Sequence, residues 1–406
     1  MRLCVVGKFP PIQGGVSRET YWDCHALASM GHRVDVITNA NEVEASFKIQ
    51  EEFYADQQSG HAPRTGCAVR VHHTGTDPAL LRYIPFSNPY VSKLAGKATE
   101  VMEEDGPFDL IYGYYLEPYG VAAQLASAWT EVPFGLRHAG SDITRLFRHD
   151  GLRKTYQRIA SRADFWLAPT LTRRGLHHLG VPYDKIYFPA APSLPAEFFH
   201  QHATPLDMAL LDERTRVNRI PGLPEPPPRP TFDPEVPTIG SYGKVGEKKG
   251  TYDLLRAFAI ARKKAGKANL VIVSSGPEAN LRLVGKLARD LSIDDCLTVL
   301  PFMPPWQVPS FITACDAVAF LERDFPIAVH RPFVPREILA CGGCLILSRE
   351  VAAYQTYAEQ LHDGSNCLLV DPCDHTELAA ALSLVVEAPA RARDIGTLGR
   401  IQVSQG

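Results

Sequence analysis

A proline-rich run near the middle of the chain constrains the fold more than any other feature. Residues 221–237 read PGLPEPPPRPTFDPEVP, a proline density that excludes helix and central strand and predicts an extended linker. On each side of it, short apolar segments alternate with helical patterns, which is typical of parallel sheets covered on both faces. The sequence therefore predicts an α/β protein with two Rossmann-like doubly wound domains, residues 1–220 and 238–406, facing a central cleft.

The same alternation runs through both halves. Strands are expected at residues 3–6, 33–38, 68–73, 109–115, 134–137, 165–169 and 185–188, then at 238–242, 269–274, 297–302, 316–321, 344–347 and 367–370. Helices are expected at 16–30, 205–216, 252–264, 278–291, 306–313, 335–341 and 376–386. Residues 41–66 are polar and lack periodicity, which predicts a long surface loop of the kind that often serves as a lid or binding loop.

Composition and charge exclude several classes of protein. With 45% hydrophobic and 21% charged residues, a chain of 406 residues can build a large globular core. The net charge of −3 gives no overall attraction to nucleic acid, so no such partner is expected. No apolar run reaches the roughly 18 residues of a membrane helix, and the first apolar stretch is too short for a signal peptide. A cytoplasmic protein is therefore expected.

The cysteines predict neither a disulfide framework nor a metal site. There are nine, an odd number, and they are scattered along the chain. Cys341 and Cys344 form the only CxxC pair, and no second pair lies at convincing zinc-ligand spacing. We therefore expect reduced thiols, no metal and no cofactor.

The segment from Gly240 to Gly250, GSYGKVGEKKG, carries the clearest chemical signal. It reads as a strand that ends in a glycine turn and opens a helix at Thr251. Glycines let the backbone approach an anion, and a helix N-terminus carries partial positive charge. Because Lys244 and Lys249 flank this turn, the segment predicts a diphosphate site.

Three weaker candidates follow strands or begin a helix. Gly14 and Gly15 could place backbone amides against a phosphate or sugar, but an ordinary turn explains them equally well. His138 could bond a sugar hydroxyl or support a developing charge, although structural histidines are more common. Glu337 follows Pro335 in a first helical turn, where it could bind ribose hydroxyls or complement the helix dipole. Neither a P-loop nor a dinucleotide fingerprint occurs.

Residues 145–162 are locally basic. The cationic residues there are Arg145, Arg148, Arg153, Lys154, Arg158 and Arg162. Such a helix could lie on an anionic membrane surface or meet an anionic acceptor, whereas a solvated helix face is the simpler interpretation. Peripheral contact with the inner face of a membrane is thus one expectation for this segment.

Together these motifs resemble the retaining GT-B glycosyltransferases of the family-4 type, also called glycosyl transferases group 1. The resemblance covers most of the chain, and the motifs keep the order and spacing of the family. The matching segments are Gly14-Gly15 (glycine loop), RHAGSD at 137–142 (HGSD), GKVGEKKG at 243–250 (G-[RK]-x3-x-K-G), SSGP at 274–277 (GxGP), PREILACG at 335–342 (LEAMACG) and DGSNCLLV at 363–370 (xGxNGLLV).

The resemblance implies a mechanism. A nucleoside-diphosphate sugar would bind mainly to the second domain, and its sugar would pass to an unidentified acceptor with retention and without a metal. Lys244 and Lys249 would neutralise the leaving diphosphate. The other implied donor-binding residues are Gly14 and Gly15 near the phosphates, His138 at the sugar, backbone groups of Phe302 and Met303 at the base, and Pro335, Arg336 and Glu337, of which Glu337 would hold the ribose.

Two departures from the family pattern keep other functions open. The first glutamate of the family's E-x7-E pair is Val329 here, and His330 or Asp324 could substitute for it. Residues 393–406 end about where the family's last helix would begin. The alternatives are a GT-B nucleotide-sugar epimerase or phosphorylase, and a non-catalytic nucleotide-sugar-binding protein. The sequence identifies neither the acceptor nor the nucleotide base.

Overall fold

The computed structural model divides the chain into two compact units, each described here by itself. The first unit comprises Met1–Lys48 and Pro63–Ser193, and the second comprises Ile49–Ala62 and Leu194–Gly406. The residues that the structure describes are 1–55, 69–76, 89–147, 149–168, 170–188, 194–217, 223–226, 231–275, 277–325 and 331–404.

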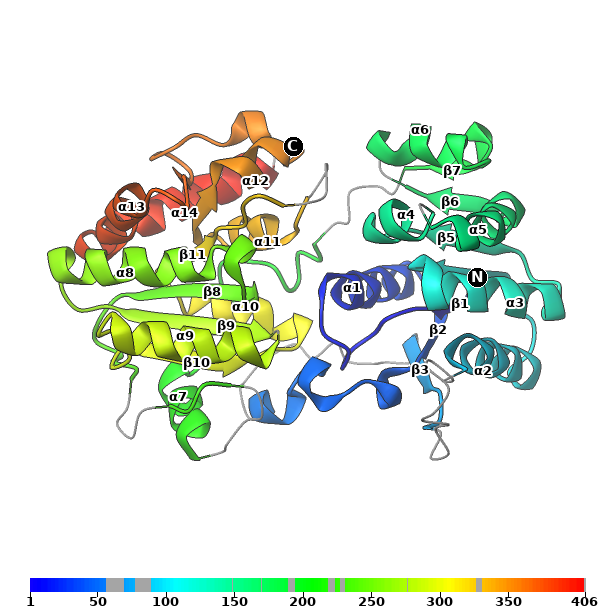
Figure 1. Ribbon diagram of the computed structural model, residues 1–406, viewed down its shortest axis with the longest axis horizontal. Coiled ribbons are helices and arrows are strands. Elements are labelled where there is room, and N and C mark those ends of the chain that lie inside the picture. The colour runs from blue at the N-terminus through cyan, green and yellow to red at the C-terminus, as the bar shows by residue number, and fades with distance from the viewer. Residues whose placement is uncertain are drawn as a thin grey trace. The chain divides into compact units, whose positions relative to one another are not determined.

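The first unit contains a seven-stranded parallel sheet in the order β3-β2-β1-β4-β5-β6-β7 (Figure 1). Its strands are β1 (Arg2–Val6), β2 (Arg33–Thr38), β3 (Val69–His73), β4 (Leu110–Tyr114), β5 (Phe134–Arg137), β6 (Phe165–Leu167) and β7 (Ile186–Tyr187). Its helices are α1 (Gly15–Ser29), α2 (Tyr90–Glu104), α3 (Val121–Thr130), α4 (Ser141–Leu146), α5 (Asp150–Arg162) and α6 (Thr170–His178).

The second unit contains a six-stranded parallel sheet in the order β10-β9-β8-β11-β12-β13. Its strands are β8 (Thr238–Lys244), β9 (Asn269–Ser275), β10 (Leu297–Pro301), β11 (Ala317–Phe320), β12 (Cys344–Ser348) and β13 (Leu368–Val370). Its helices are α7 (Met208–Val217), α8 (Thr251–Ala265), α9 (Glu278–Asp290), α10 (Val308–Thr313), α11 (Val334–Ala340), α12 (Arg349–Tyr354), α13 (His375–Glu387) and α14 (Pro389–Ser404).

Both strand orders are those of the doubly wound Rossmann fold, so the expected fold class is confirmed. The thirteen expected strands form within two residues of their expected bounds. Buried central strands read as continuous apolar runs, since helices cover both faces; all five residues of β12, for example, are buried. In each unit the strand order reverses beside the first strand, β1 or β8, and ligands of such sheets bind at the carboxyl ends of strands at this point.

The division into units differs from the expected boundary at residue 220. Helix α7 packs on the second unit, because Asp212 accepts hydrogen bonds from Thr231 Oγ1 at 2.5 Å and from Thr298 Oγ1 of β10 at 3.1 Å. Residues 49–55 also belong there, since the hydroxyl of the buried Tyr54 donates to the Pro301 carbonyl at 2.6 Å. Within the loop expected at residues 41–66, of which 56–66 lie outside the described residues, the chain forms three short 3-10 turns at Ala40–Glu42, Ala45–Phe47 and Glu51–Tyr54.

The described C-terminal segment is helical. Residues 389–404 form helix α14, which packs against α11, β12 and α13 of the second unit. Two glycines weaken the helical pattern, but close packing requires them. A Cβ at Gly396 would lie 2.3 Å from the Gly342 carbonyl oxygen, and one at Gly399 would lie 2.5 Å from that of Asn366. These glycines bring α14 against the loops that flank α11 and β13.

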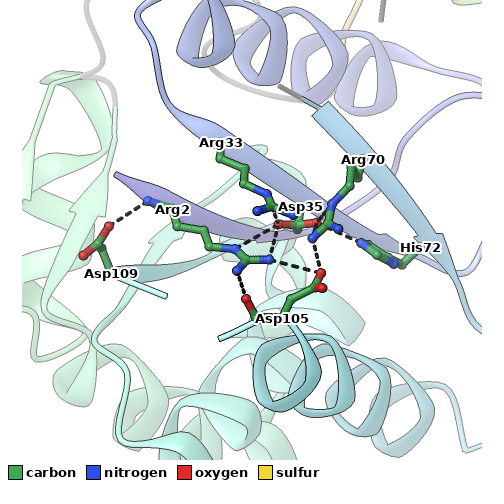
Figure 2. A network of polar contacts seen from close by, with 7 residues as sticks. All are labelled: Arg2, Arg33, Asp35, Arg70, His72, Asp105 and Asp109. Carbon is green, nitrogen blue, oxygen red and sulfur yellow. Dashed lines mark hydrogen bonds and ion pairs between the residues drawn. The ribbon is translucent and has the colours of Figure 1, made fainter. Parts of the chain in front are cut away.

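A charged network lies near the amino ends of β1, β2 and β3 (Figure 2). The buried Asp35 accepts a hydrogen bond from Arg70 Nε at 2.7 Å and lies 2.9 Å from His72 Nε2, while Asp105 bonds Arg2 and Arg70. Burial alone raises the pKa of Asp35, but the bonds from His72 and Arg70 and the charge of Arg70 outweigh burial and lower it. The network holds edge strand β3 and the end of α2 to the sheet, away from the strand ends where ligands bind.

Candidate functional site

A pocket opens at the carboxyl ends of β8, β9 and β11 in the second unit. It has about 330 Å³ of free space, part of it open solvent, which is at the lower end of the range for small-molecule sites. Its polar lining includes Ser241, Tyr242, Lys244, Lys249 and Glu322. The pocket lies beside the reversal of strand order between β8 and β11, so the fold places it where doubly wound sheets bind ligands.

Lys244 and Lys249, the two predicted phosphate-binding residues, both line this pocket. Part of the Lys244 side chain is exposed to solvent, but its ammonium is partly dehydrated by the pocket. This loss of hydration lowers the pKa of Lys244, and the positive charge of Lys249 lowers it further. Within the part of the chain that the structure describes, Lys244 makes no hydrogen bond or ion pair. Two cations that disfavour each other create a site whose electrostatic energy falls when a dianion binds.

Lys249 is placed by a turn that packs tightly on the end of β11. Residues 247–249 form a 3-10 turn, and Gly250 joins it to α8 with a φ of 68°. A Cβ at Gly250 would lie 2.2 Å from the Leu321 carbonyl oxygen, so only glycine permits this approach. The Lys249 ammonium forms an ion pair with Glu322 and lies 4.5 Å from the centre of the Phe325 ring.

Arg323 also stabilises the turn that carries Lys249. Its backbone N–H donates to the Lys248 carbonyl at 3.0 Å, and its guanidinium binds Asp253 at 2.9 Å and Glu247 at 2.6 Å. Asp253 also lies 3.0 Å from His375 Nε2 of α13. The turn that carries Lys249 is therefore held by backbone and side-chain contacts that do not involve the ammonium itself.

Glu337, the predicted ribose ligand, stands in the first turn of α11 and is fully buried. It accepts a hydrogen bond at 2.7 Å from the hydroxyl of Tyr242, which lines the pocket and packs edge-on against Phe311 at 5.7 Å. Glu337 is not among the lining residues, so Tyr242 stands between it and the described pocket. Pro335 and Arg336 precede it in the same turn.

Phe302 and Met303, the predicted base contacts, follow β10. The Phe302 carbonyl accepts a bond from the Gln50 N–H at 3.3 Å, and Met303 is buried. Residues 49–55 thus pack beside the expected base position, which the sequence did not predict. His330 and Val329 lie outside the described residues.

In the first unit, His138 follows β5 and is buried. Its Nδ1 accepts a bond from the Gly140 N–H at 2.9 Å, and its Nε2 lies 2.9 Å from Thr172 Oγ1. Burial, and then the charge of Arg137, lowers the pKa of His138 to about 4. At neutral pH the ring is therefore uncharged, with Nε2–H as the donor, which suits hydrogen bonding to a sugar better than support of a negative charge.

Asp142, the last residue of the RHAGSD motif, accepts hydrogen bonds from three backbone N–H groups. One carboxylate oxygen accepts from the Ala139 and Ile143 N–H groups at 3.1 and 3.0 Å, and the other accepts from the Leu116 N–H at 3.0 Å. Burial raises the pKa of Asp142, and these backbone bonds oppose the rise. The carboxylate therefore fixes the turn that follows His138.

Gly14 and Gly15 begin α1, and Gly14 has a φ of 115°. A Cβ at either position would have no atom within 4 Å, so the backbone here is open to a ligand. Arg137, which the sequence did not single out, joins α1 to β5: its Nη2 lies 3.1 Å from Glu19, and its guanidinium lies 4.5 Å from the centre of the Tyr114 ring.

The basic segment forms α5, an amphipathic helix. Its apolar face is buried through Tyr156, Ile159 and Ala160. Its exposed cations are Arg153, Lys154, Arg158 and Arg162. Among the helices as far as they are described, none is long and apolar enough to cross a membrane. No group of three or more potential metal ligands occurs within the described ranges.

Comparison with known proteins decides the family. Residues 225–402 match the family model of glycosyl transferases group 1, and residues 14–189 match that of a glycosyl transferase 4-like domain. The chain belongs to the GT-B glycosyltransferases of the family-4 type. The chain is similar to the D-inositol 3-phosphate glycosyltransferase of Pseudarthrobacter chlorophenolicus, which is 23% identical over 400 residues, or 93% of this chain and 83% of that enzyme.

Other similar proteins match over a shorter part of the chain or share only the fold. A GDP-mannose-dependent alpha-(1-6)-phosphatidylinositol monomannoside mannosyltransferase of Mycolicibacterium smegmatis is 25% identical over 40% of this chain and 42% of its own length. The solved structure of Anabaena HepE in complex with UDP and glucose matches 100% of this chain and 95% of its own, with a TM-score of 0.62 and 16% identity. Sucrose-phosphate synthase from Thermosynechococcus elongatus matches 100% and 94%, with a TM-score of 0.61 and 18% identity. At 16–18% identity, the likeness of these two structures to this glycosyltransferase shows a shared fold and nothing more.

Proposed function

We propose that this glycosyltransferase moves a sugar from a nucleoside-diphosphate sugar to an acceptor, with retention of configuration and without a metal. The observation that carries the proposal is the meeting of Lys244 and Lys249 in one pocket at the carboxyl edge of the second sheet. Departure of the sugar leaves a diphosphate with developing negative charge, and fixed cations stabilise that charge most in the transition state. Two ammonium groups can do so without a divalent ion.

Other residues of the chain have roles consistent with this reaction. Glu337, with Tyr242 in front of it, is a buried carboxylate suited to bind ribose hydroxyls once a donor moves Tyr242 aside. The neutral His138 ring would contact the donor sugar from the first unit, and Gly15 would offer a backbone N–H to the phosphates. Phe302 and Met303 would contact the base, and His330 and Arg336 would complete the donor site.

The relatives narrow the choice of donor and acceptor to test. HepE was solved with UDP and glucose, and the mycobacterial relative is named for GDP-mannose, so UDP and GDP sugars are the first donors. The names of two relatives contain an inositol phosphate or phosphatidylinositol acceptor. D-Inositol 3-phosphate is therefore the first acceptor in a panel that includes lipid-linked glycans.

The test incubates the protein in EDTA with UDP-glucose or GDP-mannose and measures transfer of the sugar to an acceptor or its slow hydrolysis. NMR of the anomeric proton then gives the configuration of the first product. The proposal predicts turnover in EDTA, a first product with the anomeric configuration of the donor, and loss of turnover in Lys244→Met. Turnover that requires a divalent ion, or an inverted first product, would contradict it. Epimerised donor in the absence of acceptor would instead identify the protein as an epimerase.

We also propose that the enzyme works in the cytoplasm, at the inner face of a membrane, through the exposed cations of α5. These cations are exposed while Tyr156 and Ile159 are buried, so they can meet anionic lipid without unfolding the helix. Sedimentation with phosphatidylserine vesicles tests this: binding should fall severalfold when Arg153, Lys154 and Arg158 are changed to glutamine. Equal sedimentation of the two proteins would remove the membrane role.

A further inference from the structure

Glu322 is a pocket residue to which the proposed mechanism assigns no role. It is the second residue after β11, its side chain is 9% exposed, and it pairs with the Lys249 ammonium. The backbone at this position is fixed, because the hydroxyl of Ser348 donates to the Glu322 carbonyl at 2.7 Å. The carboxylate therefore belongs to the built wall of the pocket and stands among the groups that would receive a diphosphate.

Placement of Lys249 does not require this carboxylate. The turn that carries the lysine is held by Gly250 against Leu321 and by Arg323, which binds the Lys248 carbonyl, Glu247 and Asp253. The ammonium has a second neighbour in the ring of Phe325, 4.5 Å away. A purely structural carboxylate would add little to these contacts, whereas a carboxylate beside a phosphate site has a direct electrostatic effect on every anion that enters.

That effect depends on the charge of the ligand. The diphosphate of a sugar nucleotide carries two negative charges, which the two lysines balance. Sugar transfer breaks the bond between the anomeric carbon and the diphosphate oxygen, which stays on the nucleotide as a terminal phosphate oxygen. The nucleoside diphosphate therefore carries about one negative charge more than the donor at pH 8, because the second pKa of a terminal phosphate lies near 6. A fixed carboxylate in the pocket repels the product more than the donor.

We propose that Glu322 determines the charge specificity of the pocket: it weakens binding of the nucleoside diphosphate product relative to the sugar nucleotide and so favours product release. The inference rests on the proposed nucleotide-sugar function and deepens it. One unit charge interacting with the extra product charge across a partly hydrated pocket changes the affinity ratio by about three- to tenfold.

The experiment measures dissociation constants for two ligand pairs, UDP with UDP-glucose and GDP with GDP-mannose, at pH 8. The variants are Glu322→Gln, which removes the charge, and Glu322→Asp, which keeps it. The control is Asp295→Asn. It removes a carboxylate that pairs with Arg262, and Arg262 lies in the last turn of α8, about 16 Å along the helix from the pocket residue Thr251. Melting temperatures confirm that each variant is folded.

For the pair that binds the wild-type protein, Glu322→Gln should bind the nucleoside diphosphate more tightly. Its preference for the diphosphate over the sugar nucleotide should rise about three- to tenfold. Glu322→Asp and Asp295→Asn should keep the wild-type ratio. An unchanged ratio in Glu322→Gln, or weaker binding of the diphosphate, would overturn the inference and leave Glu322 as a support for Lys249. If the wild-type protein binds neither pair, the proposed function itself fails, and the inference falls with it.

Discussion

Replacing Gly250 by alanine tests whether the turn that carries Lys249 is set by its contact with β11. Gly250 has a φ of 68°, and an added Cβ would lie 2.2 Å from the Leu321 carbonyl oxygen. The left-handed backbone costs an alanine about 1–2 kcal/mol, and relief of the contact costs about 1–3 kcal/mol more. The sum of about 2–5 kcal/mol corresponds to a fall in melting temperature of about 5–15 °C. Because the turn must move, nucleoside diphosphate affinity should also fall at least about tenfold.

Gly364 offers a matched control in the same unit. Its φ is 71°, but an added Cβ there would have no atom within 4 Å. Gly364→Ala should therefore show only the backbone cost of about 1–2 kcal/mol, or about 2–6 °C, with unchanged ligand affinity. Scanning calorimetry of the purified protein measures the melting temperature, and titration calorimetry measures the affinity for the nucleoside diphosphate. Equal effects of the two substitutions on melting and on affinity would refute the argument that the contact with Leu321 positions the turn.

Three further predictions concern single side chains. Lys244→Met should lower kcat about 10²–10³-fold in a donor-turnover assay, and a retained kcat would contradict the role of Lys244 at the leaving diphosphate. The melting temperature should stay within about 2 °C of the wild-type value, because Lys244 makes no hydrogen bond or ion pair in the described chain. Asp142→Ala should remove the acceptor of three backbone N–H groups and lower the free energy of unfolding by about 3 kcal/mol in urea titrations. Asp150→Ala, at an exposed side chain of α5, should change the free energy of unfolding by less than about 0.5 kcal/mol, and similar losses in the two variants would contradict this account. The pKa of His138 is lowered to about 4 from an ordinary value near 6.5, so the unfolded chain binds a proton at this residue more readily than the folded one. The contribution of the neutral ring to folding stability is therefore fully present above about pH 6.5 and is lost as the pH falls toward 4. His138→Gln should flatten the dependence of stability on pH in that window, and an unchanged curve would show that other groups cause the dependence.

Much of the fold could be predicted from the sequence because buried parallel strands leave an unambiguous apolar pattern. Strands β2 and β5 have the expected bounds, and the glycine turn after β8 has the expected place between strand and helix. Lys244 and Lys249 were predicted to share a site, and they line one pocket because Lys244 ends β8 and Lys249 lies in the short turn that follows it. Local spacing is sufficient when the residues of a site are close along the chain.

Contacts between distant segments could not be predicted in the same way. Nothing in residues 49–55 indicates that Tyr54 is buried against Pro301, because pairings across about 250 positions leave no local periodicity. The close approach of Gly396 to the Gly342 carbonyl likewise joins segments that are far apart in the chain, and no local pattern indicates it. Glu322 was overlooked although a polar residue directly after a buried strand is a signal for the ligand edge of a sheet.

The central claim is that the pocket at the carboxyl edge of the second sheet binds a nucleoside diphosphate through two lysines. The most direct measurement is titration calorimetry of UDP and GDP with the wild-type protein and with the Lys244→Met/Lys249→Met variant in EDTA. We predict micromolar binding of one nucleotide by the wild type and a loss of at least about 100-fold in the double variant, because each charged hydrogen bond contributes about 1.5–3 kcal/mol. Equal affinity in the two proteins would contradict the account.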